Sequence, residues 1–252
     1  MIRVSENDFS NYISWAMNCS SNQVYPLSIT EGIQSGDIYV DDPENPGMVL
    51  FWHYCGFAYI SGVTSGKILE EAEKEICHKN KRRMLLITDD DFVVHFFSRS
   101  GKEIGRRIEY EHSGGSGING QIHGIDIRRI DASNLSVING KIIPAFSWEE
   151  SKFLNRGIGY AAFDHDRFCG VAFSAAVSSA EIDIGVEVSP LYRGRGIATT
   201  LVRKMCCEIL SQGKRPVWAH AEQNTGSMRT AIRSGFVLKK VNRTVFLKKA
   251  EL

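Results

Sequence analysis

The sequence predicts an α+β fold in which helices flank a mixed, mostly antiparallel sheet. Strand-like runs of apolar residues alternate with amphipathic helical runs along the whole chain. In the second half, three strand-like runs follow one another with only short turns between them, which indicates an antiparallel meander. The length of 252 residues is enough for one large domain or two small ones.

The composition excludes several classes of protein. Hydrophobic residues make up 43% and charged residues 23% of the chain, which is typical of a globular protein. No apolar run reaches the roughly 20 residues of a membrane span, and Met1–Asn7 lacks the apolar core of a secretory signal. A net charge of +1 gives no global reason to expect nucleic acid as a partner. We therefore expect a cytoplasmic protein that binds neither membranes nor nucleic acid.

The cysteines predict free thiols and no metal site. None of the six belongs to a CxxC pair or has a histidine partner at zinc spacing. The neighbours Cys206 and Cys207 lie in a helical run, where adjacent side chains point about 100° apart and do not easily form a disulfide. Mostly buried thiols in a reducing compartment are the simplest interpretation. The other four cysteines are Cys19, Cys55, Cys77 and Cys169.

A glycine-rich stretch divides the chain. Four glycines within Ser113–Gly120 predict a linker over 113–121, between a mixed α/β domain of unknown role at 1–112 and a second domain at 122–252. In the first domain, His53 and His95 stand among aromatic residues and are interpreted as core histidines. The patterns there predict helices over 7–17, 66–78 and from Asp89 to Phe97, and strands over 48–59 and 84–88.

The second domain has a clearer pattern. A short helix is expected from Ser133, and a second one begins at Ser147, where Glu150 three residues later completes a capping box. An amphipathic helix with an apolar residue every four positions from Ile197 to Ile209 ends at Gly213. A further helix covers 224–234. The predicted strands cover 125–130, 157–163, 167–177, 180–188, 215–222, 236–241 and 243–248.

The charge is distributed unevenly. Residues 191–252 contain 13 lysines and arginines against 3 acidic residues, whereas residues 1–190 contain 17 against 26. A basic C-terminal segment suggests an anionic ligand there, and a solvated basic surface is the alternative.

The turn before the long helix has the features of a phosphate site. Arg193-Gly194-Arg195-Gly196 stands between a strand and a helix N-terminus, where free backbone N–H groups and the helix dipole attract anions. The pattern lacks the third small residue and the acidic residue of a Rossmann fingerprint, and the Gly-Lys-Ser/Thr of a Walker loop. An ordinary glycine-containing turn is the alternative interpretation.

Two motifs together resemble the GNAT superfamily of N-acetyltransferases. Arg193-x-x-Gly196-x-Ala198 resembles its acetyl-CoA-binding motif, and Asn224–Ser227 followed by Gly235-Phe236 resembles its next helix. The resemblance covers the order of elements from Ile125 to Lys249. Details around Ala180–Ile182, Trp218 and Asn224–Ser227 look most like the zwittermicin A resistance acetyltransferases, which also carry an extra N-terminal domain.

The resemblance implies acetyl-CoA as co-substrate and no metal. The pantetheine arm would form strand-like hydrogen bonds with Val186 and Val188, and Asn224 would face the pantetheine or the pyrophosphate, close to Ser227. Basic residues such as Arg229 and Arg233 could meet the adenosine phosphates. The pyrophosphate would be bound by the backbone of Arg193, Gly194, Arg195, Gly196, Ile197 and Ala198.

Three residues are candidates for the base that deprotonates the acceptor amine. The first is Glu181, because the matching family position is acidic; the second is Glu187, and the third is His220 on the neighbouring strand. The alternating pattern places Glu181, Asp183 and Glu187 on one strand face. The alternative interpretation is that this face is exposed to water and that its solvated acids have no catalytic role.

The general acid is less clearly indicated. Many superfamily members have a tyrosine seven residues after the motif asparagine, and here that position is Ala231. The acid is then Ser227, a water molecule, or none, since a thiolate is a tolerable leaving group.

The resemblance predicts transfer of an acetyl group to a primary amine of a small molecule, such as an antibiotic, by direct attack in a ternary complex. The alternatives are a catalytically silent CoA-binding or protein-interaction module and an acetyltransferase that acts on a protein amine. The first domain would shape the acceptor site or form a homodimer.

Overall fold

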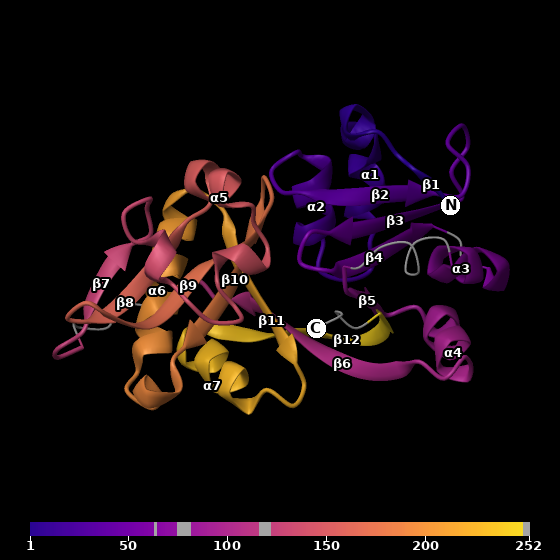
Figure 1. Cartoon of the computed structure of the whole chain (residues 1–252). Coiled ribbons are helices and arrows are strands. Elements are labelled where there is room, and N and C mark those ends of the chain that lie inside the picture. Colours follow the sequence, from indigo (N-terminus) through magenta and orange to yellow (C-terminus); the bar gives the residue numbers. More distant parts are fainter. Residues whose placement is uncertain (63–64, 75–81, 116–121, 249–252) are drawn as a thin grey trace. The chain divides into compact units, whose positions relative to one another are not determined.

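The computed structural model describes residues 1–62, 65–74, 82–115 and 122–248 (Figure 1). The chain forms two compact units. Unit 1 contains Met1–Ile108 and Lys240–Leu252, and unit 2 contains Glu109–Lys239. Within the described residues, no helix has the length and apolar character needed to cross a membrane.

Unit 1 is built on a sheet with the strand order β1-β2-β3-β4-β5-β12. The first four strands are antiparallel, β4 and β5 are parallel, and β5 pairs with the C-terminal part of β12 in antiparallel fashion. The strands are β1 (Ile2–Arg3), β2 (Gly36–Val40), β3 (Met48–His53), β4 (Phe57–Gly62), β5 (Met84–Thr88) and β12 (Phe236–Lys248).

Two helices of unit 1, α3 and α4, begin at side chains that cap them. Ser65 accepts a hydrogen bond from the backbone of Ile68 at the start of α3, and Asp90 accepts two at the start of α4. Their apolar faces pack on the sheet around Trp52, which is fully buried. The helical elements are η1 (Glu6–Tyr12), α1 (Ile13–Met17), α2 (Val24–Thr30), α3 (Gly66–Ala72) and α4 (Asp91–Arg99).

The strands of unit 2 follow one another in the order β6-β11-β10-β9-β8-β7. The strands β8, β9 and β10 form the predicted antiparallel meander, β7 pairs with β8 in antiparallel fashion, and β11 runs parallel to β10. These strands are β6 (Glu103–His112), β7 (Asp126–Arg129), β8 (Gly159–Asp164), β9 (Arg167–Val177), β10 (Glu181–Val188) and β11 (Arg215–Ala221).

The long helix α6 packs against β8, β9, β10 and β11. Its apolar residues at every fourth position, Ile197, Leu201, Met205 and Ile209, are all buried, as the sequence predicted. The helical elements of unit 2 are η3 (Leu135–Val137), η4 (Pro144–Phe146), α5 (Glu150–Arg156), η5 (Pro190–Tyr192), α6 (Ile197–Ser211) and α7 (Thr225–Arg233).

The same succession of elements occurs twice along the chain. From β1 to β6 and again from β7 to β12, a short strand and helical turns precede three antiparallel strands, a helix, a parallel strand, a helix and a last strand. The C-terminal part of β12 belongs to unit 1, and the C-terminal part of β6 belongs to unit 2. The first half of the chain, which carries no recognisable catalytic motif, thus repeats the topology of the second.

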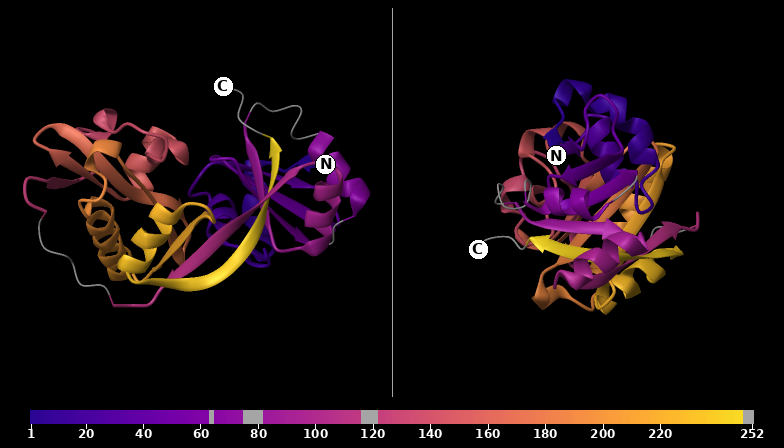
Figure 2. Two further views of the ribbon diagram at one scale, coloured as in Figure 1. Left: turned by 90° about the horizontal axis from the view of Figure 1, so that it is seen from below. Right: turned by 90° about the vertical axis from the view of Figure 1, so that its right-hand side faces the viewer.

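Several predicted elements differ from those observed. Residues 48–59 form two strands and not one, because the chain turns at Gly56, where φ is +89°. The two final strands predicted at 236–241 and 243–248 are one continuous strand, β12 (Figure 2). Where a short helix was predicted from Ser133, the chain forms only the 3-10 turn η3. Ser147 does not cap a helix, since α5 begins one residue after Glu149.

The predicted domain limits also differ from the two units. Residues of β12 from Lys240 on group with unit 1, because Arg243–Lys248 pair with Thr88–Met84 of β5. Of the predicted linker, only 113–115 is described, and residues 116–121 lie outside the described residues, as does Cys77. His53 is fully buried as predicted, whereas His95 is exposed on α4 and is not a core residue.

Candidate functional site

The site begins where two parallel strands of unit 2 separate. Pairing between β10 and β11 extends from Glu181↔Arg215 to Asp183↔Val217, three residues from each strand. Directly after Asp183, the register between β10 and β9 shifts by one residue, which marks a β-bulge at this point. The stretch from Ile184 to Val188 continues beyond the paired region and remains joined to β9.

The glycine turn that follows β10 is open. Gly194 and Gly196 have φ angles of +79° and +83°, which other residues rarely adopt. A Cβ atom at either position would meet nothing within 4 Å. Gly196 is the N-cap of α6 and supplies no side-chain cap, so the first N–H groups of a 15-residue helix face this opening. The turn therefore has the geometry of an anion cradle.

Both arginines of the turn are exposed, and each has one contact close to the turn. Arg193 donates from Nε to the carbonyl of Val188, at 3.3 Å. The guanidinium of Arg195 lies over the ring of Tyr192, 5.4 Å from its centroid, and the Tyr192 hydroxyl donates to Asp164. Two positive charges thus flank the free N–H groups of α6.

The second motif forms the start of α7. The Asn224 side chain accepts a hydrogen bond from the backbone N–H of Ser227, at 3.0 Å, and caps the helix. The hydroxyl of Ser227 accepts one from Nε1 of the buried Trp218 on β11, at 3.1 Å. Asn224 and Ser227 therefore have structural contacts of their own. Arg229 and Arg233 are exposed on the same helix.

Glu181 lies at the paired end of β10. Its Oε1 atom accepts from Nη2 of Arg215 at 2.8 Å, and the residue is 9% exposed. Its position is at the end of the strand opposite to the glycine turn. The predicted wet strand face is wrong, since Asp183 is 3% exposed and Gly185 is also buried.

Glu187 lies in the stretch of β10 beyond the paired region. Its Oε2 atom accepts hydrogen bonds from the backbone N–H groups of Lys141, at 2.7 Å, and Ile142, at 2.5 Å. The residue is half-buried and lies close to Gly140. The carboxylate thereby fixes the loop before η4 against the sheet, a contact that has no signal in the sequence.

His220 is 4% exposed and forms a buried pair with Tyr110 of β6. Its Nδ1 atom lies 2.8 Å from the carbonyl of Ala221, which only accepts, so Nδ1 carries the proton. Nε2 then accepts from the Tyr110 hydroxyl at 3.3 Å, and the two rings are stacked. Burial raises the pKa of Tyr110, which keeps this donor protonated. The sequence missed Tyr110 because it falls in the predicted first domain.

The structure thus keeps one group of the predicted cofactor residues in a single segment, and it separates the candidates for the base. Val186, Val188 and the glycine turn are continuous in one segment that leads into α6. Glu181 and Glu187 lie at opposite ends of β10, each with its own partners. Within the described residues, no three His, Cys, Asp or Glu side chains group as metal ligands would.

The comparisons with known proteins agree with this architecture. A GCN5-related N-acetyltransferase-like protein from Streptococcus suis aligns with a TM-score of 0.77 and 18% identity over 96% of this chain and 99% of that one. An acetyltransferase of the GNAT family from Colwellia psychrerythraea aligns with a TM-score of 0.63 and 10% identity, over 98% and 99% of the two chains. A tandem GNAT protein from the clavulanic acid biosynthesis pathway aligns with a TM-score of 0.66 and 12% identity, over 99% of each.

At these identities, the structural matches establish the fold alone, which is α+β with a mixed, mostly antiparallel sheet. A search among curated proteins finds no match. The sequence model of the GNAT acetyltransferases matches residues 17–244, nearly the whole chain and both units. The chain belongs to the GNAT acetyltransferase family.

Proposed function

We propose that the protein transfers the acetyl group of acetyl-CoA to a primary amine of a small molecule, by direct attack within a ternary complex. The observation that carries this proposal is the separation of β10 from β11 next to an uncapped, glycine-lined N-terminus of α6. An open strand edge offers hydrogen bonds to an extended amide-containing arm, and the helix N-terminus offers N–H groups to phosphates.

The residues present fit the chemical nature of the co-substrate. The backbone from Arg193 to Ala198 would hold the pyrophosphate, because both glycines leave the space in front of the N–H groups free. Val186 and Val188 lie on β10 between the paired region and the glycine turn, where they would bind the pantetheine arm. Asn224 and Ser227 would contact it from α7. The bound thioester supplies the activated acetyl group.

Catalysis would depend mostly on positioning. Holding amine and thioester together removes much of the entropic cost of their encounter, and backbone N–H groups on β10 would stabilise the oxyanion that forms. Of the two carboxylates, Glu187 is the better candidate for the base, because it lies beyond the paired region of β10. Glu181 is paired with Arg215 at the other end.

The fate of the departing thiolate involves Ser227 or solvent. Ala231 is fully buried and has no proton to give. Ser227 accepts from Trp218, so its own proton is available for donation in another direction. A thiolate also leaves without a proton, and the proposal does not require an acid.

For the acceptor we propose an antibiotic or a similar small amine, a choice supported by the resemblance of the sequence motifs to the zwittermicin A resistance acetyltransferases. Action on a protein amine, or CoA binding without transfer, would give a different result in the same experiment. We further propose that the protein needs no metal and works in the cytoplasm. A homodimer is a further prediction.

The test has two parts. Calorimetry with acetyl-CoA should show saturable binding, and a panel of small primary amines should release CoA thiol in a protein-dependent manner. If CoA is released only with protein or peptide amines, the acceptor is a protein amine and not a small molecule. Tight binding of acetyl-CoA without release for any amine would leave a binding module and refute the enzyme.

A further inference from the structure

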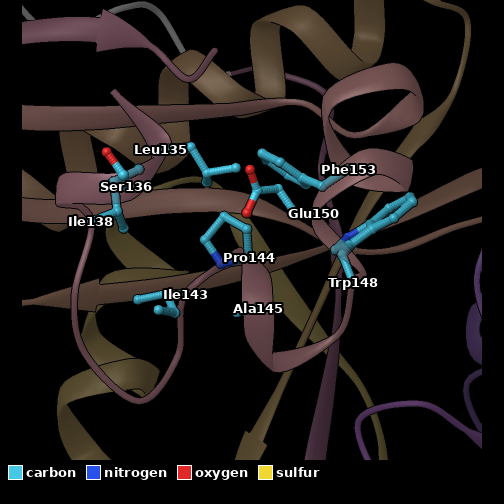
Figure 3. A pocket seen from close by; sticks show the side chains of 9 residues that line it. All are labelled: Leu135, Ser136, Ile138, Ile143, Pro144, Ala145, Trp148, Glu150 and Phe153. Atoms are coloured by element: carbon cyan, nitrogen blue, oxygen red, sulfur yellow. The ribbon is translucent and has the colours of Figure 1, made fainter. Parts of the chain in front are cut away.

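Unit 2 contains a pocket that none of the proposed catalytic or cofactor-binding residues lines (Figure 3). Its volume is about 130 Å³, and it lies between η3, η4 and α5. Trp148 and Phe153 form the inner wall and are 3% and 2% exposed. The apolar lining consists mainly of Leu135, Ile138, Ile143, Pro144, Trp148 and Phe153.

Among the described residues that line this pocket, one side chain is charged. Glu150, in the first turn of α5, is exposed, and its carboxylate points inward between Leu135 and Phe153 (Figure 3). The indole N–H of Trp148 is engaged, since it donates to the carbonyl of Ser174 at 2.6 Å. A ligand would therefore meet apolar walls and a single negative charge, which fits an apolar molecule with a cationic group.

The inner wall is attached to the sheet directly beside the register shift between β9 and β10. Trp148 bonds to Ser174, and Phe153 packs edge-on against Phe173, with ring centroids 6.5 Å apart. Ser174 and Phe173 of β9 pair with Ile184 and Gly185, the first residues after the register shift. A Cβ atom at Gly185 would meet the Phe173 ring at 2.7 Å, so these layers are in close contact.

The outer rim is attached to the same strand. Ile143 lines the pocket, and the preceding residue Ile142 donates its backbone N–H to Glu187. The rim is thus anchored on β10 itself and the inner wall on the residues of β9 that pair with it, beside the proposed thioester site. This is where an acceptor has to approach.

We propose that this pocket binds the acceptor of the proposed acetyl transfer, and that the acceptor is an apolar amine with a second cationic group that pairs with Glu150. This inference rests on the proposed function, because an acceptor exists only if the protein transfers an acetyl group. The attacking amine must be neutral, and the Phe153–Phe173 contact lies between the pocket and β10. The charge held by Glu150 is therefore a separate ammonium or guanidinium group.

The first experiment measures binding without turnover. The full chain, saturated with CoA, is titrated with 2-phenylethylamine and with its neutral analogue 2-phenylethanol. We expect the cation to bind at least fivefold more tightly, and Glu150→Gln to reduce this preference to less than twofold. Glu149→Gln is the matched control, since Glu149 is the adjacent exposed residue and pairs with Lys152. Equal binding of the two probes, or a preference that survives in Glu150→Gln, would overturn the inference.

The second experiment uses transfer kinetics with an aromatic diamine and the corresponding monoamine. We expect Glu150→Gln to raise the KM for the diamine at least fivefold without changing its kcat. The kcat/KM for the monoamine should stay unchanged, because a monoamine whose ammonium group binds at Glu150 is not acetylated from that position. A kcat effect equal for both amines would overturn the pocket as acceptor site. If no amine is acetylated, the proposed function fails, whereas the titration still decides whether the pocket binds an apolar cation.

Discussion

Glu181 and Arg215 form an ion pair across the first paired residues of β10 and β11, with Oε1 and Nη2 2.8 Å apart. The pair closes the end of the two strands opposite to the glycine turn. Arg215 is largely exposed while Glu181 is buried, so solvent screens the interaction only on one side. This arrangement gives Glu181 a structural role that the sequence did not indicate.

We expect Glu181→Gln to lower stability and leave turnover nearly unchanged. The amide keeps one hydrogen bond to Arg215 but loses the charge, which costs about 1 kcal/mol and lowers the melting temperature by about 2–4 °C. Glu187→Gln should lower kcat about 100-fold, because an amide cannot take the proton of the amine. Thermal unfolding measures the stability of each variant, and CoA release measures its kcat. A large kcat loss in Glu181→Gln alone would make that residue the base.

The glycine turn predicts a difference between the two ends of α6. Gly196→Ala and Gly213→Ala place a Cβ at positions with φ of +83° and +71°, and neither Cβ has a neighbour within 4 Å. Both variants should therefore lose similar stability, about 1 kcal/mol. Only Gly196→Ala blocks the approach of phosphate to the N–H groups, and we expect its Kd for acetyl-CoA to rise at least tenfold.

The control is the calorimetric Kd of Gly213→Ala, which should equal that of the unmodified protein. If both variants weaken binding equally, the effect comes from the helix as a whole, and the turn is not the phosphate site.

Although the topology is repeated, we expect each chain to bind one acetyl-CoA and not two. In unit 1, the corresponding strand-to-helix connection is closed at both ends that the structure describes. A Cβ at Gly62 would collide with the carbonyl of Gly47 and meet the Trp15 ring at 2.8 Å, and one at Gly66 would meet Phe96 at 3.3 Å. Ser65 also caps α3. Calorimetry should give a stoichiometry of one, and Gly196→Glu should remove all binding. Residual binding of one equivalent in that variant would place a second site elsewhere.

Asn224 allows capping to be separated from cofactor binding. Asn224→Ala should destabilise the protein by about 1 kcal/mol, because the N–H of Ser227 loses its acceptor. Asn224→Asp caps equally well, so its stability should be unchanged. A carboxylate beside the cofactor's phosphates repels them, so we expect this variant to bind acetyl-CoA severalfold more weakly. Unchanged affinity in Asn224→Asp would limit the residue to capping.

His53 predicts acid sensitivity of folding. Burial lowers the pKa of His53 from 6.5 to about 3, with a smaller contribution from Arg82. Between these values, the unfolded chain binds a proton that the folded chain does not, so stability falls as the pH falls below about 6.5. For one such group, the loss between pH 7 and pH 5 is about 2 kcal/mol. Urea unfolding at both pH values measures it, with His53→Gln as the comparison. The variant should lose about 2 kcal/mol less over this range, and an equal loss would exclude His53 as the cause.

The local patterns of the second half were sufficient for most of its elements. The apolar period from Ile197 to Ile209 predicted α6 because one face of a helix must be buried, and the same residues are buried in the structure. The turn from Arg193 to Gly196 was recognisable because positive φ and free N–H groups require glycine at fixed positions. These features depend on neighbours in the sequence, and the sequence contains them.

Other features depend on residues that are far apart. Nothing near Glu181 predicts its pairing with Arg215, and nothing near Tyr110 predicts that its hydroxyl would meet His220, since both contacts arise only when strands are placed side by side. The continuity of β12 and its pairing with β5 likewise follow from long-range hydrogen bonds. The sequence by itself determined the glycine turn, the amphipathic helix and the family. Tertiary structure decided which carboxylates are neutralised, that the first half repeats the second, and where the apolar pocket of Glu150 lies, because each of these requires side chains from separate elements to meet.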